Sequence, residues 1–310
     1  VEDRVTGAVF IGKGEFQLKP ALPVERRHLR WLTEADEIRD SFDRMVLRFT
    51  DSTAEEIRSG GQARSGERRE AAADLLQKHR LKLSEKPVYT DYNVAIGYLQ
   101  YNLDLRLLQD VTWPGPKGFF HAWFEGARLG ELLYVVDPLG APAVEPEEVA
   151  LVALSDNALG IWVAEPLEPA CRPDAPPAAA HRLIDAEHYD IDATVRGKRL
   201  EAKAHFRFQA LAEGLRTLPL DLFPKLRMRK VTDGQGRELF FVQEDKDKDA
   251  GFGVILEEPL RKGEKYELLF EYAGDDAIDD SGRGNYSLVA RHNWYPSLGL
   301  TDRATFAMTL

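Results

Sequence analysis

The chain has 310 residues, 44% of them hydrophobic, which is longer than a usual single domain, so we expect two domains. Its 52 acidic and 41 basic residues give a formal charge of -11, which opposes binding to a nucleic-acid backbone. No apolar run approaches the roughly 18 residues of a transmembrane segment, and the first residues lack the pattern of a signal peptide. The single cysteine, Cys171, excludes an internal disulfide.

Residues 1–165 mix strand and helix patterns, which predicts an α+β domain. The helical segments show apolar residues three or four positions apart, and the strand segments are short apolar runs bounded by turn residues. We expect helices at 24–32, 54–59, 70–81 and 94–108, strands at 8–11, 15–18, 45–49, 149–154 and 160–163, and a hairpin at 118–138 with its turn at 125–126. No motif in this domain indicates its role.

Two residues of this domain receive a structural interpretation. His121 lies inside an apolar strand pattern, so we expect a partly buried residue rather than a metal ligand. Trp113 precedes a Pro-Gly-Pro sequence, and a tryptophan in this position covers a core more often than it lines a binding groove.

Residues 166–180 contain five prolines and a run of alanines, a composition that predicts an interdomain linker. The following region, 181–310, shows alternating apolar residues and turn signals roughly every 8–12 residues, which predicts an antiparallel β-sandwich or saddle. The expected strands are 188–195, 200–208, 217–221, 226–232, 239–243, 253–256, 266–272 and 305–310. The fold class is therefore mostly β, with an α+β domain in front.

The common catalytic motifs are absent from the sequence. There is no H-E-x-x-H zinc motif, no G-x-S-x-G nucleophile elbow and no P-loop, and no two of the seven histidines lie three or four positions apart. The Gly-Phe-Gly at 251–253 lacks the third glycine of a dinucleotide fingerprint. We therefore expect no catalytic residue, cofactor site or metal site in this chain.

Charged clusters are interpreted as surface features. Residues 245–249 place Asp at alternate positions, as calcium loops do, but Ala250 and Leu256 stand where Gly and a carboxylate are required, which favours a hairpin tip. The acidic residues in 275–280 predict a charged loop between two strands. Residues 185–192 around His188 predict an exposed polar strand face.

The basic run 225–230 alternates with Leu226 and Met228, which is typical of a half-exposed strand rather than of a nucleic-acid surface.

Three segments of the β-rich region occur in a familiar order: HYDI at 188–191, KGEKYEL at 262–268, and WYP at 294–296 before Asp302 and a strand. Over residues 183–310 this order resembles the N-terminal β-domain of the M1 zinc aminopeptidases. The resemblance implies a β-saddle that packs on a thermolysin-like catalytic domain and helps to shape the pocket for the substrate's free amino end.

The resemblance also implies partners and a cofactor. Zinc is expected in the parent protein's catalytic domain, which we expect to follow Leu310, and not in these residues. The implied partners are that C-terminal catalytic domain and a peptide substrate, and the implied location is periplasmic or extracellular, as for a secreted protein. The chain is thus interpreted as a non-catalytic N-terminal fragment of a metallopeptidase, a hydrolase.

The sequence departs from the family where many members place a Gln or Glu that grips the substrate amine. Residues 287–293 contain no carboxylate, so the candidates for the rim of a cleft are Arg291, His292 and Asn293. The alternative hypothesis is a self-contained β-rich module that binds a protein or glycan and has no enzymatic role.

Overall fold

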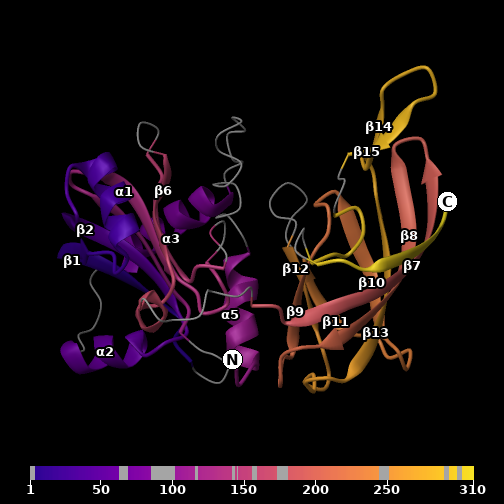
Figure 1. The fold of residues 1–310 in the computed structure, drawn as a ribbon, viewed down its shortest axis with the longest axis horizontal. Helices are drawn as coiled ribbons and strands as arrows, with labels where there is room; N and C mark the ends of the chain where they lie inside the picture. The colour runs from indigo at the N-terminus through magenta and orange to yellow at the C-terminus, as the bar shows by residue number, and fades with distance from the viewer. Residues whose placement is uncertain are drawn as a thin grey trace. The chain divides into compact units, whose positions relative to one another are not determined.

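The computed structural model contains two compact units (Figure 1). Unit 1 comprises Val1–Gln100 and Pro116–His181, and unit 2 comprises Tyr101–Gly115 and Arg182–Leu310. The structure describes residues 4–62, 69–84, 102–115, 118–141, 144, 146–155, 159–172, 181–243, 251–289, 293–298 and 302–310. The fold is mostly β with several antiparallel sheets, as the sequence predicts.

Unit 1 contains a six-stranded antiparallel sheet in which each strand pairs with the next strand along the chain. In order, its strands are β1 (Gly7–Leu18), β2 (Ile38–Phe49), β3 (Phe120–Gly126), β4 (Gly130–Val136), β5 (Val149–Ala153) and β6 (Gly160–Glu165). The two strands expected at 8–11 and 15–18 form one strand, β1, whose register shifts between Ile11 and Gly14. The glycine-rich segment is therefore an irregularity inside a strand and not a turn.

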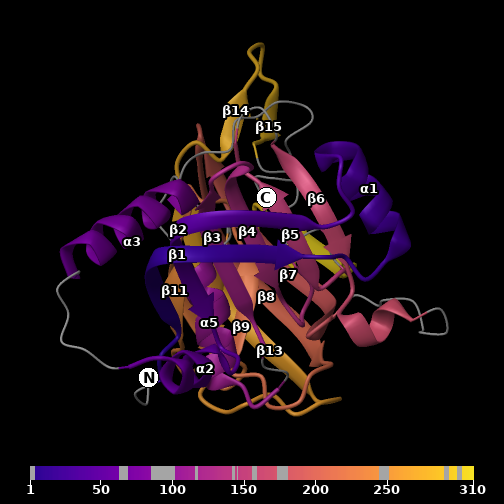
Figure 2. The same cartoon turned by 90° about the vertical axis from the view of Figure 1, so that its left-hand side faces the viewer.

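The described helices of unit 1 are α1 (Pro23–Thr33), α2 (Thr53–Gly60), α3 (Arg69–Ser84) and the short 3-10 helix η1 (Glu168–Cys171). They confirm the helices expected at 24–32, 54–59 and 70–81. Figure 2 shows α1 beside β6, the strand that α1 contacts. The Glu165 carboxylate at the end of β6 accepts the backbone N–H groups of Ala21 and Leu22, at 3.0 and 2.9 Å, just before α1 begins. This pair of bonds holds the start of the helix against the sheet.

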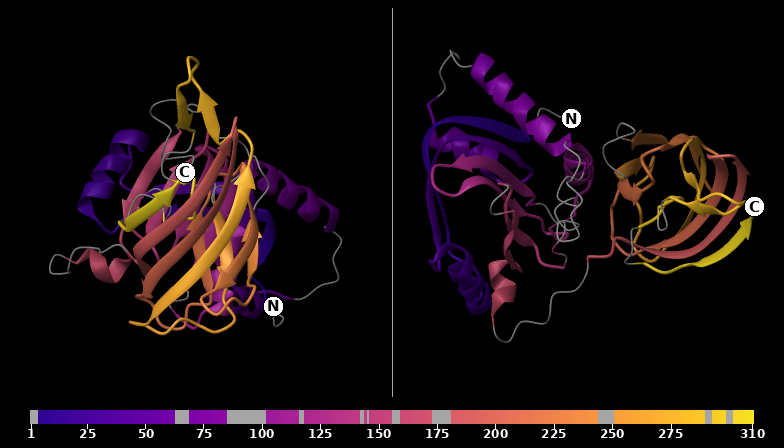
Figure 3. Two further views of the ribbon diagram at one scale, coloured as in Figure 1. Left: turned by 90° about the vertical axis from the view of Figure 1, so that its right-hand side faces the viewer. Right: turned by 90° about the horizontal axis from the view of Figure 1, so that it is seen from above.

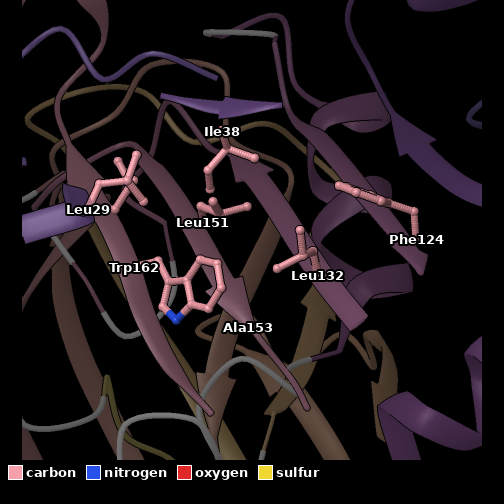
Figure 4. Close-up of a cluster of buried hydrophobic side chains, with 8 residues drawn as sticks. Leu29, Ile38, Phe124, Leu132, Leu151, Ala153 and Trp162 are labelled. Atoms are coloured by element: carbon pink, nitrogen blue, oxygen red, sulfur yellow. The ribbon is translucent and has the colours of Figure 1, made fainter. Parts of the chain in front are cut away.

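The core of unit 1 lies between α1 and the sheet (Figure 4). Leu29 of α1 is fully buried among sheet residues that include Leu151 and Trp162. Every second residue of a strand points to the same face of the sheet, and residues three or four apart share one side of a helix. The buried apolar side chains therefore come from one face of the sheet and from one side of α1.

The hairpin between β3 and β4 confirms the one expected at 118–138, but its turn lies at 127–129, later than predicted. Asp40 of β2 determines this position, because its carboxylate accepts the N–H of Leu129 at 2.8 Å. A Cβ atom at Gly126 would lie 2.3 Å from the Asp40 carboxylate, so only glycine fits there. The local sequence of the hairpin could not predict the position of the turn, because Asp40 lies 89 positions before Leu129.

Unit 2 contains a five-stranded sheet ordered β10-β13-β8-β7-β16, a three-stranded sheet ordered β11-β12-β9 and a β14–β15 hairpin, which projects beyond the long strands (Figure 3). The strands are β7 (Ile184–Arg196), β8 (Arg199–Ala210), β9 (Thr217–Asp221), β10 (Leu226–Asp233), β11 (Phe240–Gln243), β12 (Gly251–Ile255), β13 (Lys265–Gly274), β14 (Ile278–Asp280), β15 (Tyr286–Leu288) and β16 (Thr305–Thr309). All pairings between described strands are antiparallel except that of β16 with β7.

The alternation in β8 has the predicted result: its apolar residues are buried in a single row. This row is Ala202, Ala204, Phe206 and Phe208. In the basic run 225–230, Leu226 and Met228 are likewise buried, as expected of a half-exposed strand. The rings of Phe252 and Phe270 meet edge to face at 6.1 Å and join the two larger sheets.

Helix α5 (Leu103–Thr112) belongs to unit 2, although the sequence placed its residues in the first domain, 1–165. The Asn102 side chain caps it by accepting the N–H of Leu105 at 2.9 Å. Leu105 lies over Gly253 of β12, where a Cβ atom would approach it to 2.1 Å. The segment 101–115 is therefore an excursion of the chain into the β-rich unit.

Trp113, directly after α5, is buried, and its indole N–H donates to the carbonyl oxygen of Glu213 at 2.7 Å. The prediction that it covers a core is confirmed. The chain divides between His181 and Arg182, directly after the predicted linker 166–180, of which residues 173–180 lie outside the described residues.

The acidic segment 275–280 is not a plain loop, because its last three residues form β14. Asp275 and Asp276 make ion pairs with Arg199 and Lys225, at 3.1 and 3.5 Å. The sequence does not reveal β14 and β15, because three-residue strands are too short to show alternation.

Candidate functional site

A cavity of about 300 Å³ lies in unit 2, next to the edge where β16 pairs with β7. Its lining comes from three segments: β7 at 186–189, the WYP region at 295–298, and residues 302–306 at the start of β16. Two of these segments carry the motifs on which the family resemblance rests. The fold thus brings residues that are more than 100 positions apart in the sequence together around this cavity.

Asp302 fixes the lining in place. Its Oδ2 accepts the N–H of Ala186 in β7 at 2.7 Å, and its Oδ1 accepts the N–H of Arg303 at 2.8 Å. The Arg182 guanidinium forms an ion pair with the same carboxylate. Because these donors occupy the Asp302 carboxylate, it anchors β16 to β7, although Arg182 is shared with Asp185.

Aromatic rings form the apolar wall of the cavity. The ring of Tyr189 stacks on that of Phe306 at 5.3 Å, and Tyr295 meets both rings edge-on at 5.0 and 5.4 Å. Burial raises the pKa of the Tyr189 phenol, and the nearby Tyr295 and Asp302 raise it further, so this phenol stays protonated. Trp294 is buried, and its ring meets that of Tyr295 edge to face at 5.4 Å.

Ser297 supplies a polar group to the same lining. It is 2% exposed, and no described residue hydrogen-bonds to its hydroxyl. Its backbone forms a two-way bridge with Asp221 of β9, with N–H to oxygen distances of 2.8 and 2.9 Å. No histidine or carboxylate among the described residues hydrogen-bonds to the Ser297 hydroxyl as an activating base would.

Asp221 is a largely buried carboxylate at the end of β9. Burial raises its pKa to about 6, and no residue in the described part of the chain hydrogen-bonds to its side chain. A carboxylate in such surroundings is poorly solvated when it is charged. Its contribution to stability is therefore unfavourable at neutral pH.

The residues predicted for the cleft rim are only partly described. Arg291 and His292 lie outside the described residues, as do the acidic residues of 245–249. Asn293 is buried, with 8% of its surface exposed, and its backbone carbonyl oxygen accepts the backbone N–H of Phe223 at 2.7 Å. The cleft-rim role stays a prediction.

A pair of histidines in unit 1 was not found from the sequence. His79 of α3 and His121 of β3 are each 1% exposed, and their Nε2 atoms lie 3.1 Å apart, so one ring donates and the other accepts. His121 is thus fully buried and not partly buried as expected. Burial lowers its pKa well below the usual value, and His79 and Arg48 lower it further.

The sequence gives little indication that His79 and His121 are in contact, because 42 positions separate them. His79 lies four positions after Leu75 and so continues the apolar stripe of α3. Within the described part of the chain, no three His, Cys, Asp or Glu side chains are grouped closely enough to hold a metal ion. No described helix is long and apolar enough to span a membrane.

No family model matches the sequence, and no curated protein matches it. Among solved structures, an M1 zinc metallopeptidase from Deinococcus radiodurans bound to a Tyr-Ser-Ala substrate shares 25% identity over 43% of this chain and 33% of its own, with a TM-score of 0.36. Leukotriene A4 hydrolase from Saccharomyces cerevisiae shares 18% identity over 40% of this chain and 23% of its own, with a TM-score of 0.33. The match thus spans a third or less of those proteins. Likeness at these TM-scores establishes neither a family nor an activity for this chain.

Proposed function

We propose that unit 2 is the N-terminal β-domain of an M1-like zinc aminopeptidase, a scaffold and pocket wall for a thermolysin-like catalytic domain. The ordered motifs at 188–191, 262–268 and 294–296 support this proposal. In the fold, the first and third of these segments adjoin through the contact of Tyr189 with Tyr295. They therefore serve a common structural purpose, which is to build the β7–β16 edge.

The observation that carries the proposal is the apolar face of β16. Phe306 and Met308 pair with Tyr189 and Ile191, which are 2% and 1% exposed, and so lie on the same buried face of the sheet. Yet Phe306 and Met308 are 43% and 57% exposed. The core-forming face thus continues to the edge strand with no described residue covering it fully, as suits a surface that packs on another domain.

The test uses the parent protein that includes the proposed catalytic domain. Met308→Lys introduces a charge on the proposed packing face, so we expect at least a tenfold loss of kcat/KM for an aminoacyl substrate because the domains separate. Thr309→Lys is the matched control, because Thr309 points to the opposite face, beside Asp192, and should leave turnover unchanged.

Residues 1–310 alone are expected to show no turnover and no stoichiometric zinc by elemental analysis. A reading frame without an H-E-x-x-H segment after Leu310, or equal activity of the two lysine variants, would refute the proposal and favour the self-contained binding module.

A further inference from the structure

The cavity beside β16 contains a buried hydroxyl with no described partner. Ser297 is 2% exposed, it is one of the residues that line the cavity, and no described residue hydrogen-bonds to its hydroxyl. A buried hydroxyl without a hydrogen bond costs stability, and native proteins rarely retain one unless water or a ligand completes it. The position of Ser297 therefore indicates a molecule that fills the cavity and accepts or donates a hydrogen bond there.

The charges of the lining favour an anion. Asp302 is already engaged by two backbone N–H groups and by Arg182, which it shares with Asp185. Arg303, which also lines the cavity, makes no side-chain ion pair or hydrogen bond with any described residue. An arginine and an unpartnered hydroxyl in the lining of the same cavity offer donors suited to a carboxylate.

The walls and the size define the rest of the ligand. Tyr189, Tyr295 and Phe306 offer ring faces and edges, which suit an aromatic or aliphatic body. A volume of about 300 Å³ lies at the lower end of ligand cavities, so the ligand is small. We propose that this cavity binds a small organic monocarboxylate, with its carboxylate at Arg303 and Ser297 and its apolar body against the three rings.

This inference does not depend on the proposed peptidase function, and residues 1–310 suffice to test it. The probe is 3-phenylpropionate, titrated by calorimetry and by NMR. Propionate lacks the ring, and 3-phenyl-1-propanol lacks the charge, so each should bind at least tenfold more weakly than the probe. Saturable binding of 3-phenylpropionate below about 10 mM is expected.

Two variants locate the binding. Arg303→Gln should weaken 3-phenylpropionate at least tenfold, whereas the matched control Arg283→Gln, at the exposed tip of the β14–β15 hairpin, should leave its affinity unchanged. Ser297→Ala should weaken binding several-fold without lowering the melting temperature, because the hydroxyl it removes has no described partner. An unchanged melting temperature for each variant shows that it folds.

The proposal is overturned if the probe does not saturate below about 10 mM, or if the neutral alcohol binds as tightly as the carboxylate. Equal affinities of Arg303→Gln and Arg283→Gln would overturn it as well, since the anion would then lie elsewhere. None of these results depends on peptidase activity, so they leave the proposed scaffold role to its own test.

Discussion

Two buried carboxylates of unit 1 differ in their hydrogen bonding from two polar groups that border one bridge of unit 2. In unit 1, the buried carboxylates Asp40 and Glu165 each accept backbone N–H groups from distant segments and thereby fix a turn and the start of a helix. In unit 2, the Ser297 hydroxyl and the Asp221 carboxylate have no recorded side-chain hydrogen bond, and both lie on the bridge that borders the cavity. Polar burial therefore supports structure at these two positions of unit 1, whereas at this bridge of unit 2 it lies next to the candidate site.

This difference has a physical meaning. A satisfied buried carboxylate stabilises the fold, so its removal should cost free energy. A buried carboxylate without hydrogen bonds destabilises the fold, so replacing it with a neutral residue should increase the free energy of unfolding. Such a carboxylate is then present for a reason other than stability. The following predictions test this contrast, and hydrogen exchange is the main readout because it reports on each unit separately.

The largest effect is expected where the wall of the cavity rests on its core. Trp294→Ala should destabilise unit 2 by about 3–5 kcal/mol, since it empties a buried site, 8% exposed, behind Tyr295. Trp31→Ala in unit 1 is the control: that side chain is 81% exposed, and its loss should change stability by less than about 0.5 kcal/mol. Denaturant unfolding of both variants measures the difference, and equal losses would show that Trp294 does not anchor the wall.

The next effect concerns a satisfied carboxylate. Glu165→Gln leaves one acceptor for the two N–H groups of Ala21 and Leu22, so unit 1 should lose about 2 kcal/mol. Protection of the α1 amides against hydrogen exchange should fall with it, because the start of the helix is released. Exposed Glu34→Gln, just after α1, serves as the control and should leave that protection unchanged.

These contrasts were only partly accessible from the sequence. Alternation predicted the long strands, as in β8, because a period of two residues is a local property. It did not reveal that α5 packs in unit 2, since an apolar stripe shows which face is buried but not what covers it. The same limit hid the contact of His79 with His121 and the cavity around Ser297, which arise from tertiary pairing.

The histidine pair makes unit 1 sensitive to acid. The His121 imidazole titrates near pH 6.5 in the unfolded chain and is held neutral in the fold, where its pKa is much lower. Below about pH 6.5 the unfolded state therefore binds more protons, and stability falls as pH decreases. We expect the stability of unit 1 to fall steadily between pH 6.5 and pH 5, measured by hydrogen exchange at α3.

His121→Gln should abolish this pH dependence even if it lowers stability at pH 7. The exposed His28 of α1 provides the control, because His28→Gln should preserve the wild-type pH profile. A flat wild-type profile over this range would contradict the assignment of a neutral buried imidazole.

The smallest effect has the opposite sign and lies beside the cavity. The pKa of Asp221 is about 6 in the fold, against roughly 3.9 in the unfolded chain, so between these values the folded state binds more protons. Stability of unit 2 should therefore fall as pH rises from 4 to 6. Asp221→Asn removes this charge and should therefore stabilise unit 2 at pH 7. We expect a gain of only about 1 kcal/mol, because contact with solvent screens part of the charge in the wild-type protein.

The same substitution should give no gain at pH 4, where Asp221 is protonated in the fold. Asp192→Asn, on the exposed face of β7, is the matched control and should change stability by less than about 0.5 kcal/mol at pH 7. An equal gain from Asp221→Asn at both pH values would mean that charge is not the cause. A loss at pH 7 would mean that the Asp221 carboxylate is satisfied, and the contrast with Asp40 and Glu165 would then fail at the residue bridged to Ser297.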